Sequence, residues 1–64
     1  MELLNADEVA TLLQLSRNKI VIMARNGDIP AYLLLGKLRF DADEIAEWVK
    51  KLRVHPGDPV RLEV

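Results

Sequence analysis

One stretch decides the fold, residues 14–27: Gln-Leu-Ser-Arg-Asn-Lys-Ile-Val-Ile-Met-Ala-Arg-Asn-Gly. Ser16 suits the start of a helix, because its hydroxyl can accept a hydrogen bond from a first-turn backbone N–H. Gly27 suits the end, because glycine adopts the left-handed conformation without a Cβ penalty. Apolar residues between them recur at helical spacing and predict a buried stripe, namely Ile20, Met23 and Ala24. We therefore predict a helix over residues 16–26, with Val21 and Ile22 turned away from the core.

The first turn of this helix carries Arg17, Asn18 and Lys19. Two cations at a helix N-terminus oppose the macrodipole, at a cost of about 0.3–1 kcal/mol each when exposed. Stability alone favours acids at these positions. The arrangement therefore indicates an anionic partner, such as the phosphates and base edges of a DNA major groove.

A second helix is predicted just before this stretch, after a short lead-in at residues 1–4. Asn5 and Glu8 have the spacing of a capping box. The predicted buried stripe consists of Ala6, Val9, Ala10, Leu12 and Leu13. The connection Gln14-Leu15 is very short, and we expect Leu15 to point inward. Such a link favours the steep crossing of a helix-turn-helix over an ordinary helical hairpin.

A β-hairpin is predicted after Gly27. Pro30 forces the preceding residue into an extended conformation. Residues 31–40 then hold two β-prone runs on either side of a Gly36-Lys37 turn. Alternation along the second run places Arg39 on the face opposite its apolar neighbours.

Asp41 suits the start of a last helix, with apolar residues at i, i+3, i+4 and i+7: Ile45, Trp48, Val49 and Leu52. We expect Trp48 to anchor the core. The predicted fold is thus mainly α with a small β-hairpin, in a domain of residues 1–53. Residues 54–64 form a predicted tail, either disordered or ending in a short strand.

Composition narrows the function. A chain of 64 residues allows one small domain. It contains no cysteine and one histidine, His55, with no glycine-rich phosphate loop. We therefore expect no metal, no cofactor and no catalysis; capping and solvation explain the carboxylate pair Asp43 and Glu47. No apolar run approaches membrane-spanning length, so the expected location is the cytoplasm.

Charge is clustered, although the formal net charge is −1. Residues 16–40 hold five bases against one acid, whereas residues 1–15 hold three acids and no base. Acids also exceed bases over residues 41–64, by six to four. A basic middle between acidic flanks is compatible with an electrostatic footprint for nucleic acid.

The order of elements, with specific residues in register over residues 3–52, resembles a known family. The matching residues are Ala6-Asp7-Glu8-Val9-Ala10, Leu12-Leu13, Leu15-Ser16-Arg17, Ile20, Gly27, Ile29-Pro30-Ala31, Gly36, Arg39-Phe40, Ile45 and Trp48. The chain resembles the excisionase-type, MerR-like winged helix-turn-helix domains of small bacterial and phage DNA-binding proteins. The resemblance implies that helix 16–26 enters the major groove and that hairpin 31–40 is a wing on the backbone or minor groove. The implied DNA-binding residues are Ser16, Arg17, Asn18, Lys19, Ile22, Lys37 and Arg39.

Two functions remain open at this point. The first is a DNA-binding protein, either an excisionase-like architectural factor in recombination or a transcription regulator. The second is a protein-interaction or homodimerisation module on the same fold, or the N-terminal domain of a longer protein. It would use apolar residues outside the core, namely Val21, Ile22, Leu33 and Leu35.

Overall fold

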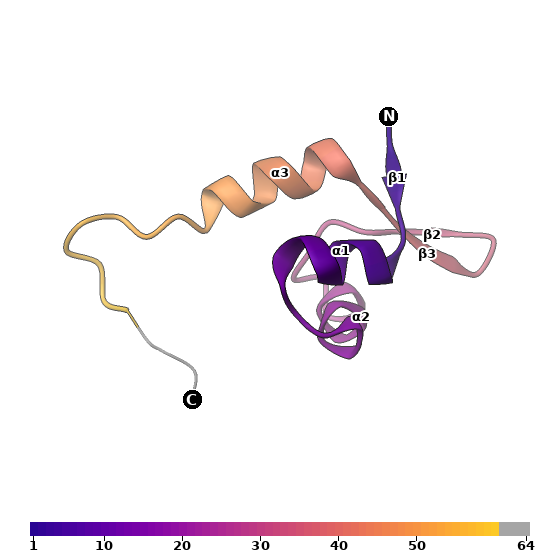
Figure 1. Cartoon of the computed structure of the whole chain (residues 1–64), viewed down its shortest axis with the longest axis horizontal. Coiled ribbons are helices and arrows are strands. Elements are labelled where there is room, and N and C mark those ends of the chain that lie inside the picture. The colour runs from indigo at the N-terminus through magenta and orange to yellow at the C-terminus, as the bar shows by residue number, and fades with distance from the viewer. Residues whose placement is uncertain (61–64) are drawn as a thin grey trace.

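The computed structural model describes residues 1–60, which form three helices and three short strands (Figure 1). In chain order the elements are β1 (Leu3–Leu4), α1 (Ala6–Leu13), α2 (Arg17–Arg25), β2 (Tyr32–Leu34), β3 (Lys37–Asp41) and α3 (Ala42–Lys51). This is a mainly helical fold with a β-hairpin wing. It confirms the predicted winged helix-turn-helix class.

Each helix begins at the predicted cap. The side chain of Asn5 accepts from the backbone N–H of Glu8 at 2.8 Å, and Glu8 accepts from the N–H of Asn5 at 2.9 Å. Ser16 accepts from the N–H of Lys19 at 3.1 Å. Asp41 accepts from the N–H of Asp43 at 3.0 Å. These bonds satisfy N–H groups that have no partner inside the helix.

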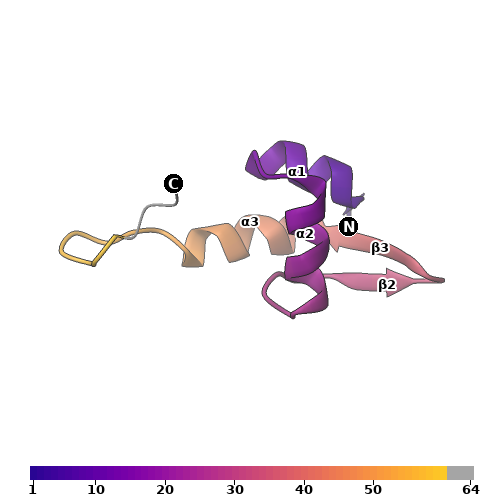
Figure 2. The same cartoon turned by 90° about the horizontal axis from the view of Figure 1, so that it is seen from below.

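The turn between α1 and α2 contains a strained residue. Gln14 has a φ of 57°, which costs a residue other than glycine about 1–2 kcal/mol. The backbone N–H of Leu15 then donates to the carbonyl of Ala10 at 2.9 Å and closes the end of α1. The chain reverses sharply, and α2 runs across α1 (Figure 2).

Leu15 does not point inward, and that prediction was wrong. The residue is 41% exposed, since the tight turn uses its backbone N–H and leaves its side chain at the surface. Leu12 is also outside the core, at 61% exposure. It borders a shallow apolar groove between α1 and α3 rather than the contact with α2.

Gly27 ends α2 as predicted. It has a φ of 75°, and its N–H donates to the carbonyl of Ala24 at 3.2 Å. The N–H of Asp28 donates to the carbonyl of Met23 at 2.8 Å. This pair of bonds is the Schellman motif, in which glycine is the favoured left-handed residue.

The strands form one antiparallel sheet in the order β1-β3-β2. Residues 1–4 are therefore more than a lead-in, because Leu3 pairs with Asp41 and Leu4 with Phe40. The pairing was not visible in the sequence, since β1 has 2 residues and its partner lies far along the chain.

The hairpin turn lies one residue earlier than predicted. Leu34 pairs with Lys37, so the turn residues are Leu35 and Gly36, with φ of 52° and 79°. Two successive positive φ values are typical of a type I′ turn, whose twist matches that of the flanking strands. This preference places the turn at Leu35-Gly36 instead of Gly36-Lys37.

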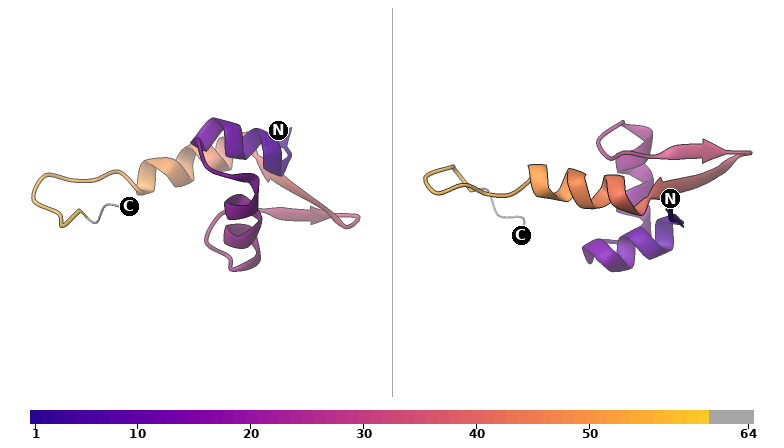
Figure 3. Two further views of the ribbon diagram at one scale, coloured as in Figure 1. Left: turned by 60° about the horizontal axis from the view of Figure 1, so that its bottom comes forward. Right: turned by 90° about the horizontal axis from the view of Figure 1, so that it is seen from above.

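The core lies where the two crossed helices, β3 and the start of α3 meet. Its buried apolar residues are Ala6, Val9, Ala10, Ile20, Ile29, Phe40 and Ile45. Trp48 packs against this cluster but is only partly buried, so its predicted role as the anchor is wrong. The reason is that α3 packs mainly on β3 and extends beyond the body (Figure 3). Phe40 and Ile20 are the large residues at the centre.

Residues 54–60 form neither helix nor strand. The strand predicted at the C-terminus falls mainly on residues 61–64, which lie outside the described part of the chain. Over residues 1–60, no helix has the length and apolar character needed to cross a membrane.

Candidate nucleic-acid interface

A groove of about 540 Å³ runs between α2, the hairpin and the start of α1. Each of these three elements contributes part of the lining: Asn5, Ala6 and Asp7; Arg17, Val21 and Arg25; and Gly36, Lys37, Leu38 and Arg39. The groove exists because α2 crosses α1 steeply and the hairpin projects at a steep angle to α2 (Figure 2). It therefore joins the two elements that the sequence predicted as the DNA-binding parts.

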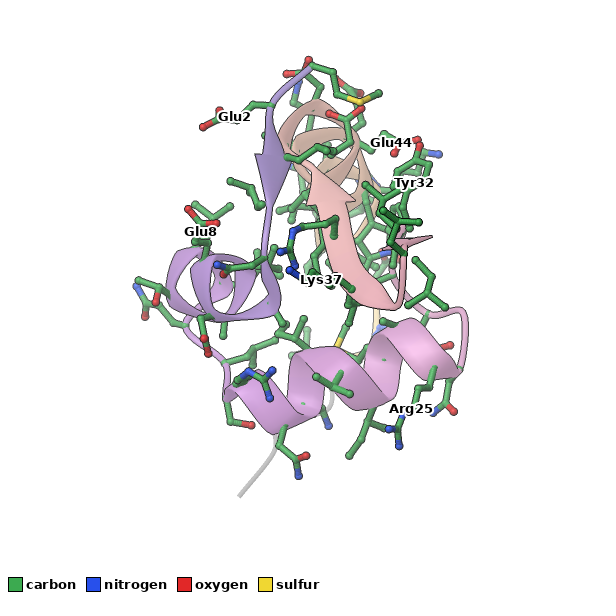
Figure 4. The ribbon with its side chains drawn as sticks, turned by 90° about the vertical axis from the view of Figure 1, so that its right-hand side faces the viewer. Glu2, Glu8, Arg25, Tyr32, Lys37 and Glu44 are labelled. Carbon is green, nitrogen blue, oxygen red and sulfur yellow. The ribbon has the colours of Figure 1, made fainter. Side chains whose placement is uncertain are left out.

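The groove is strongly basic. Among the described residues that line it, four carry positive charge, namely Arg17, Arg25, Lys37 and Arg39, and one carries negative charge, Asp7. Figure 4 shows Lys37 on the hairpin between α1 and α2, and Arg25 on the outer side of α2. Cations gathered in one concave surface focus a positive potential that attracts polyanions.

Arg17 makes an ion pair inside this groove. Its Nε lies 3.2 Å from Oδ1 of Asp7, and both side chains are mostly exposed. Exposed pairs of this kind contribute about 0–1 kcal/mol. Arg17 can therefore exchange Asp7 for a phosphate or a base edge at little cost.

Arg39 is held more firmly than the other cations. It is half-buried, and its Nη1 donates to the carbonyl of Leu38 at 2.7 Å. It pairs across the hairpin with Tyr32, while Leu38 and Phe40 face the core, which confirms the predicted alternation. A guanidinium has five N–H donors, so this bond leaves others for a ligand.

The hairpin is tied to α3 through Tyr32. Its hydroxyl donates to Oε1 of Glu44 at 2.6 Å. This hydrogen bond, more than any other contact, raises the pKa of Tyr32 above its ordinary value of 10.0. The bond joins the outer strand of the wing to the third helix and helps to fix the wing's direction.

The floor of the groove is apolar and includes Val21 and Leu38, both partly buried against the core. The prediction that Val21 faces away from the core is therefore wrong. At about 100° per residue, Val21 lies only about 100° from the fully buried Ile20, at the edge of the buried stripe. Ile22 lies one step further round and is 45% exposed, as predicted.

The predicted DNA-binding residues divide into groups. Three of them, Arg17, Lys37 and Arg39, meet in the groove. Asn18 and Ile22 are exposed on the outer face of α2, and Lys19 lies roughly 200° around the helix from Arg17. Ser16 uses its oxygen as the N-cap acceptor, which leaves its hydroxyl hydrogen for another partner.

Arg25 was missed by sequence reasoning, which concentrated on the first turn of α2. A signal was present, because Arg25 follows Val21 by four residues and Arg17 by eight, so all three lie along one side. Arg25 also follows Asn18 and Ile22 by seven and three residues. It consequently borders both the groove and the outer face of α2.

Within residues 1–60, no group of histidine, cysteine, aspartate and glutamate side chains could hold a metal ion. A family model described as a helix-turn-helix domain matches residues 3–53 of the chain. Neither the curated proteins nor the solved structures include a match.

Proposed function

Because the chain belongs to the helix-turn-helix domain family, whose typical role is DNA binding without catalysis, we propose that it binds double-stranded DNA. In this proposal α2 lies in the major groove and the β2–β3 hairpin is a wing on the neighbouring backbone. The observation that carries the proposal is the basic groove between these two elements, whose lining holds four cations and one acid. Residues 1–53 are the binding unit, and residues 54–64 are an appendage to it.

The cations have different proposed roles. Arg17 and Asn18 lie at the N-terminal end of α2, the part of a recognition helix that reaches base edges. Arginine can bond guanine through two atoms, and asparagine can do the same with adenine. Ile22, exposed on the next turn, suits contact with a thymine methyl group.

The remaining cations suit the phosphate backbone. Lys37 and Arg39 on the hairpin and Arg25 at the end of α2 border the same groove as Arg17. Ser16 and Lys19, beside the start of α2, complete the proposed set. Contacts of this kind fix the register of the protein on the duplex but do not read sequence.

The biological role is proposed to be that of an excisionase-like architectural factor or a transcription regulator. Both roles use the same interface, and both need a protein that positions itself on duplex DNA. An architectural factor bends its DNA site. A transcription regulator instead blocks other proteins from its site or recruits them to it.

A second candidate is a protein-interaction or homodimerisation module. The exposure of Ile22 and of Leu33, at 73%, favours it, because exposed apolar side chains can form an interface. The cations beside Ile22 argue against it, since the centre of a protein interface is depleted of charge. Val21 does not contribute, because it packs partly against the core.

A binding selection on duplex DNA of random sequence tests the proposal. We expect an enriched sequence, and we expect Arg17→Ala to weaken binding to it by about 1–3 kcal/mol while relaxing one base position. Arg53→Ala, which removes an exposed arginine outside the groove, is the matched control and should change neither. A salt-insensitive dimer with no affinity for DNA would support the second candidate instead.

A further inference from the structure

The tip of the wing carries a leucine that the fold does not use. Leu35 has a relative exposure of 102% and a φ of 52°. Asparagine, aspartate and glycine dominate this position of a type I′ turn, because they tolerate positive φ. The chain therefore holds an apolar side chain in water, in a backbone conformation that leucine disfavours. Folding gains nothing from either property.

The position of Leu35 in the molecule is also specific. The hairpin tip lies at the end of the molecule opposite α3 and the C-terminal segment (Figure 1). The hairpin runs across α2 rather than alongside it (Figures 2 and 3). A duplex that holds α2 in its major groove would therefore meet the tip in a flanking groove.

The charges around Leu35 indicate what the tip contacts. Lys37 lies two residues further along the chain and Arg39 four, and both line the basic groove. Gly36 follows Leu35 directly. A Cβ at Gly36 would have no neighbouring atom within 4 Å, so the backbone at the tip is uncrowded. An apolar side chain beside cations suits a DNA duplex, whose phosphates are anionic and whose base faces are apolar where a step is unstacked.

A protein partner fits these features less well. The outer edge of β2 could pair with a strand of another chain through its backbone, but such pairing does not involve the side chain of a turn residue. Lys37 and Arg39 would also lose water in a protein interface, which is unfavourable unless the partner supplies acids to pair with them.

We propose that Leu35 is a wedge that enters the minor groove beside the α2 site, partly unstacks one base step and kinks the duplex. This inference rests on the proposed DNA binding. Architectural proteins insert leucine and other apolar side chains in this way and kink DNA by about 20–90° toward the major groove. Among the two proposed roles, a wedge favours the architectural one.

The test uses a duplex of about 30 base pairs that carries the sequence recovered by selection, with donor and acceptor dyes at its ends. Energy transfer reports the bend, and 2-aminopurine at successive positions of the flanking sequence reports unstacking. We expect the parent protein to raise both signals. Leu35→Asn should still bind the duplex but return both signals to those of free DNA, whereas Leu35→Met should keep them.

Leu52→Asn is the matched control, since Leu52 is also exposed but lies on the C-terminal side of α3. It should bend the duplex as the parent does. Thermal melting checks that the variant is folded. Leu35→Asn relieves the strain of a left-handed leucine, so it should raise the melting temperature by about 4–8 °C.

The outcomes separate the two proposals. Parent protein that binds without bending, or Leu35→Asn that bends as fully as the parent, overturns the wedge and leaves DNA binding intact. Failure of the parent to bind any duplex overturns both. A parent dimer in sedimentation that Leu35→Asn converts to a monomer overturns the wedge in favour of a protein partner.

Discussion

Removing one cation from the groove should lower the salt dependence of DNA binding by the amount of one phosphate contact. The change proposed is Arg25→Ala, because Arg25 borders the groove and, among the described residues, makes no ion pair that would have to break first. Each neutralised phosphate contributes about −0.9 to the slope of log K against log salt. Four cations are proposed to contact phosphate, namely Lys19, Arg25, Lys37 and Arg39, so the predicted slope is about −3.6, and without Arg25 it is about −2.7.

These slopes give distinct losses of affinity. Between 50 and 200 mM salt, a fourfold change, the parent should lose about 150-fold in affinity and Arg25→Ala about 40-fold. Fluorescence anisotropy of a labelled duplex of random sequence, measured at five salt concentrations, resolves this difference. Random sequence is suitable because phosphate contacts do not depend on base identity.

Arg53→Ala is the control, since it removes the same side chain from an exposed position outside the groove. Its slope should equal that of the parent. The reasoning is refuted if Arg25→Ala keeps the slope of the parent, or if Arg53→Ala lowers the slope equally. In the second case net charge, and not the groove, governs binding.

Three further predictions concern stability and the ion pair at the groove. Gln14→Gly should raise the free energy of unfolding by up to about 1 kcal/mol, because it relieves a left-handed residue; a lower midpoint in urea would contradict this. Phe40→Ala should lower the free energy of unfolding by about 3–5 kcal/mol and leave the chain largely unfolded by circular dichroism. Trp48→Ala should lower it much less, because Trp48 is only partly buried. Asp7→Ala should strengthen DNA binding by up to about fivefold, since it removes the acid that pairs with Arg17; unchanged affinity at low salt would show that Asp7 does not compete with phosphate.

Features that depend on a few neighbouring residues could be read from the sequence. The caps at Asn5, Ser16 and Asp41 each form within three residues, and Gly27 ends α2 through bonds to the preceding turn. The boundaries of the helices follow from these bonds. The helix-turn-helix itself was predictable because a short link between two capped helices leaves few geometries.

Features that depend on distant residues could not be read in this way. β1 exists only because β3 offers it an edge, and the partial burial of Trp48 depends on where α3 leaves the body. Leu12 was misplaced because helical periodicity gives an apolar face but not the width of the surface that covers it. Leu15 was misplaced because its apolar character does not show which way the turn directs its side chain.

The same distinction applies to the candidate site. Arg17, Lys37 and Arg39 were chosen on residue type and on the element that carries them, and the structure places them around one groove. Arg25 was missed because its place at the groove depends on the direction of the hairpin, which a single sequence does not give. Whether these residues bind DNA remains a prediction for the experiments above.

The overhang of α3 makes local stability uneven along one helix. Ile45 is fully buried, whereas Val49 is 42% and Leu52 58% exposed. Amide hydrogens in the first turns of α3 should therefore exchange with solvent at a rate set by global unfolding, and those of the last turns much faster. Trp48 lies at the boundary between the two regimes, so its fluorescence would report the docking of α3 on the sheet separately from the unfolding of the core. One native tryptophan thus makes the fraying of this helix measurable without a label.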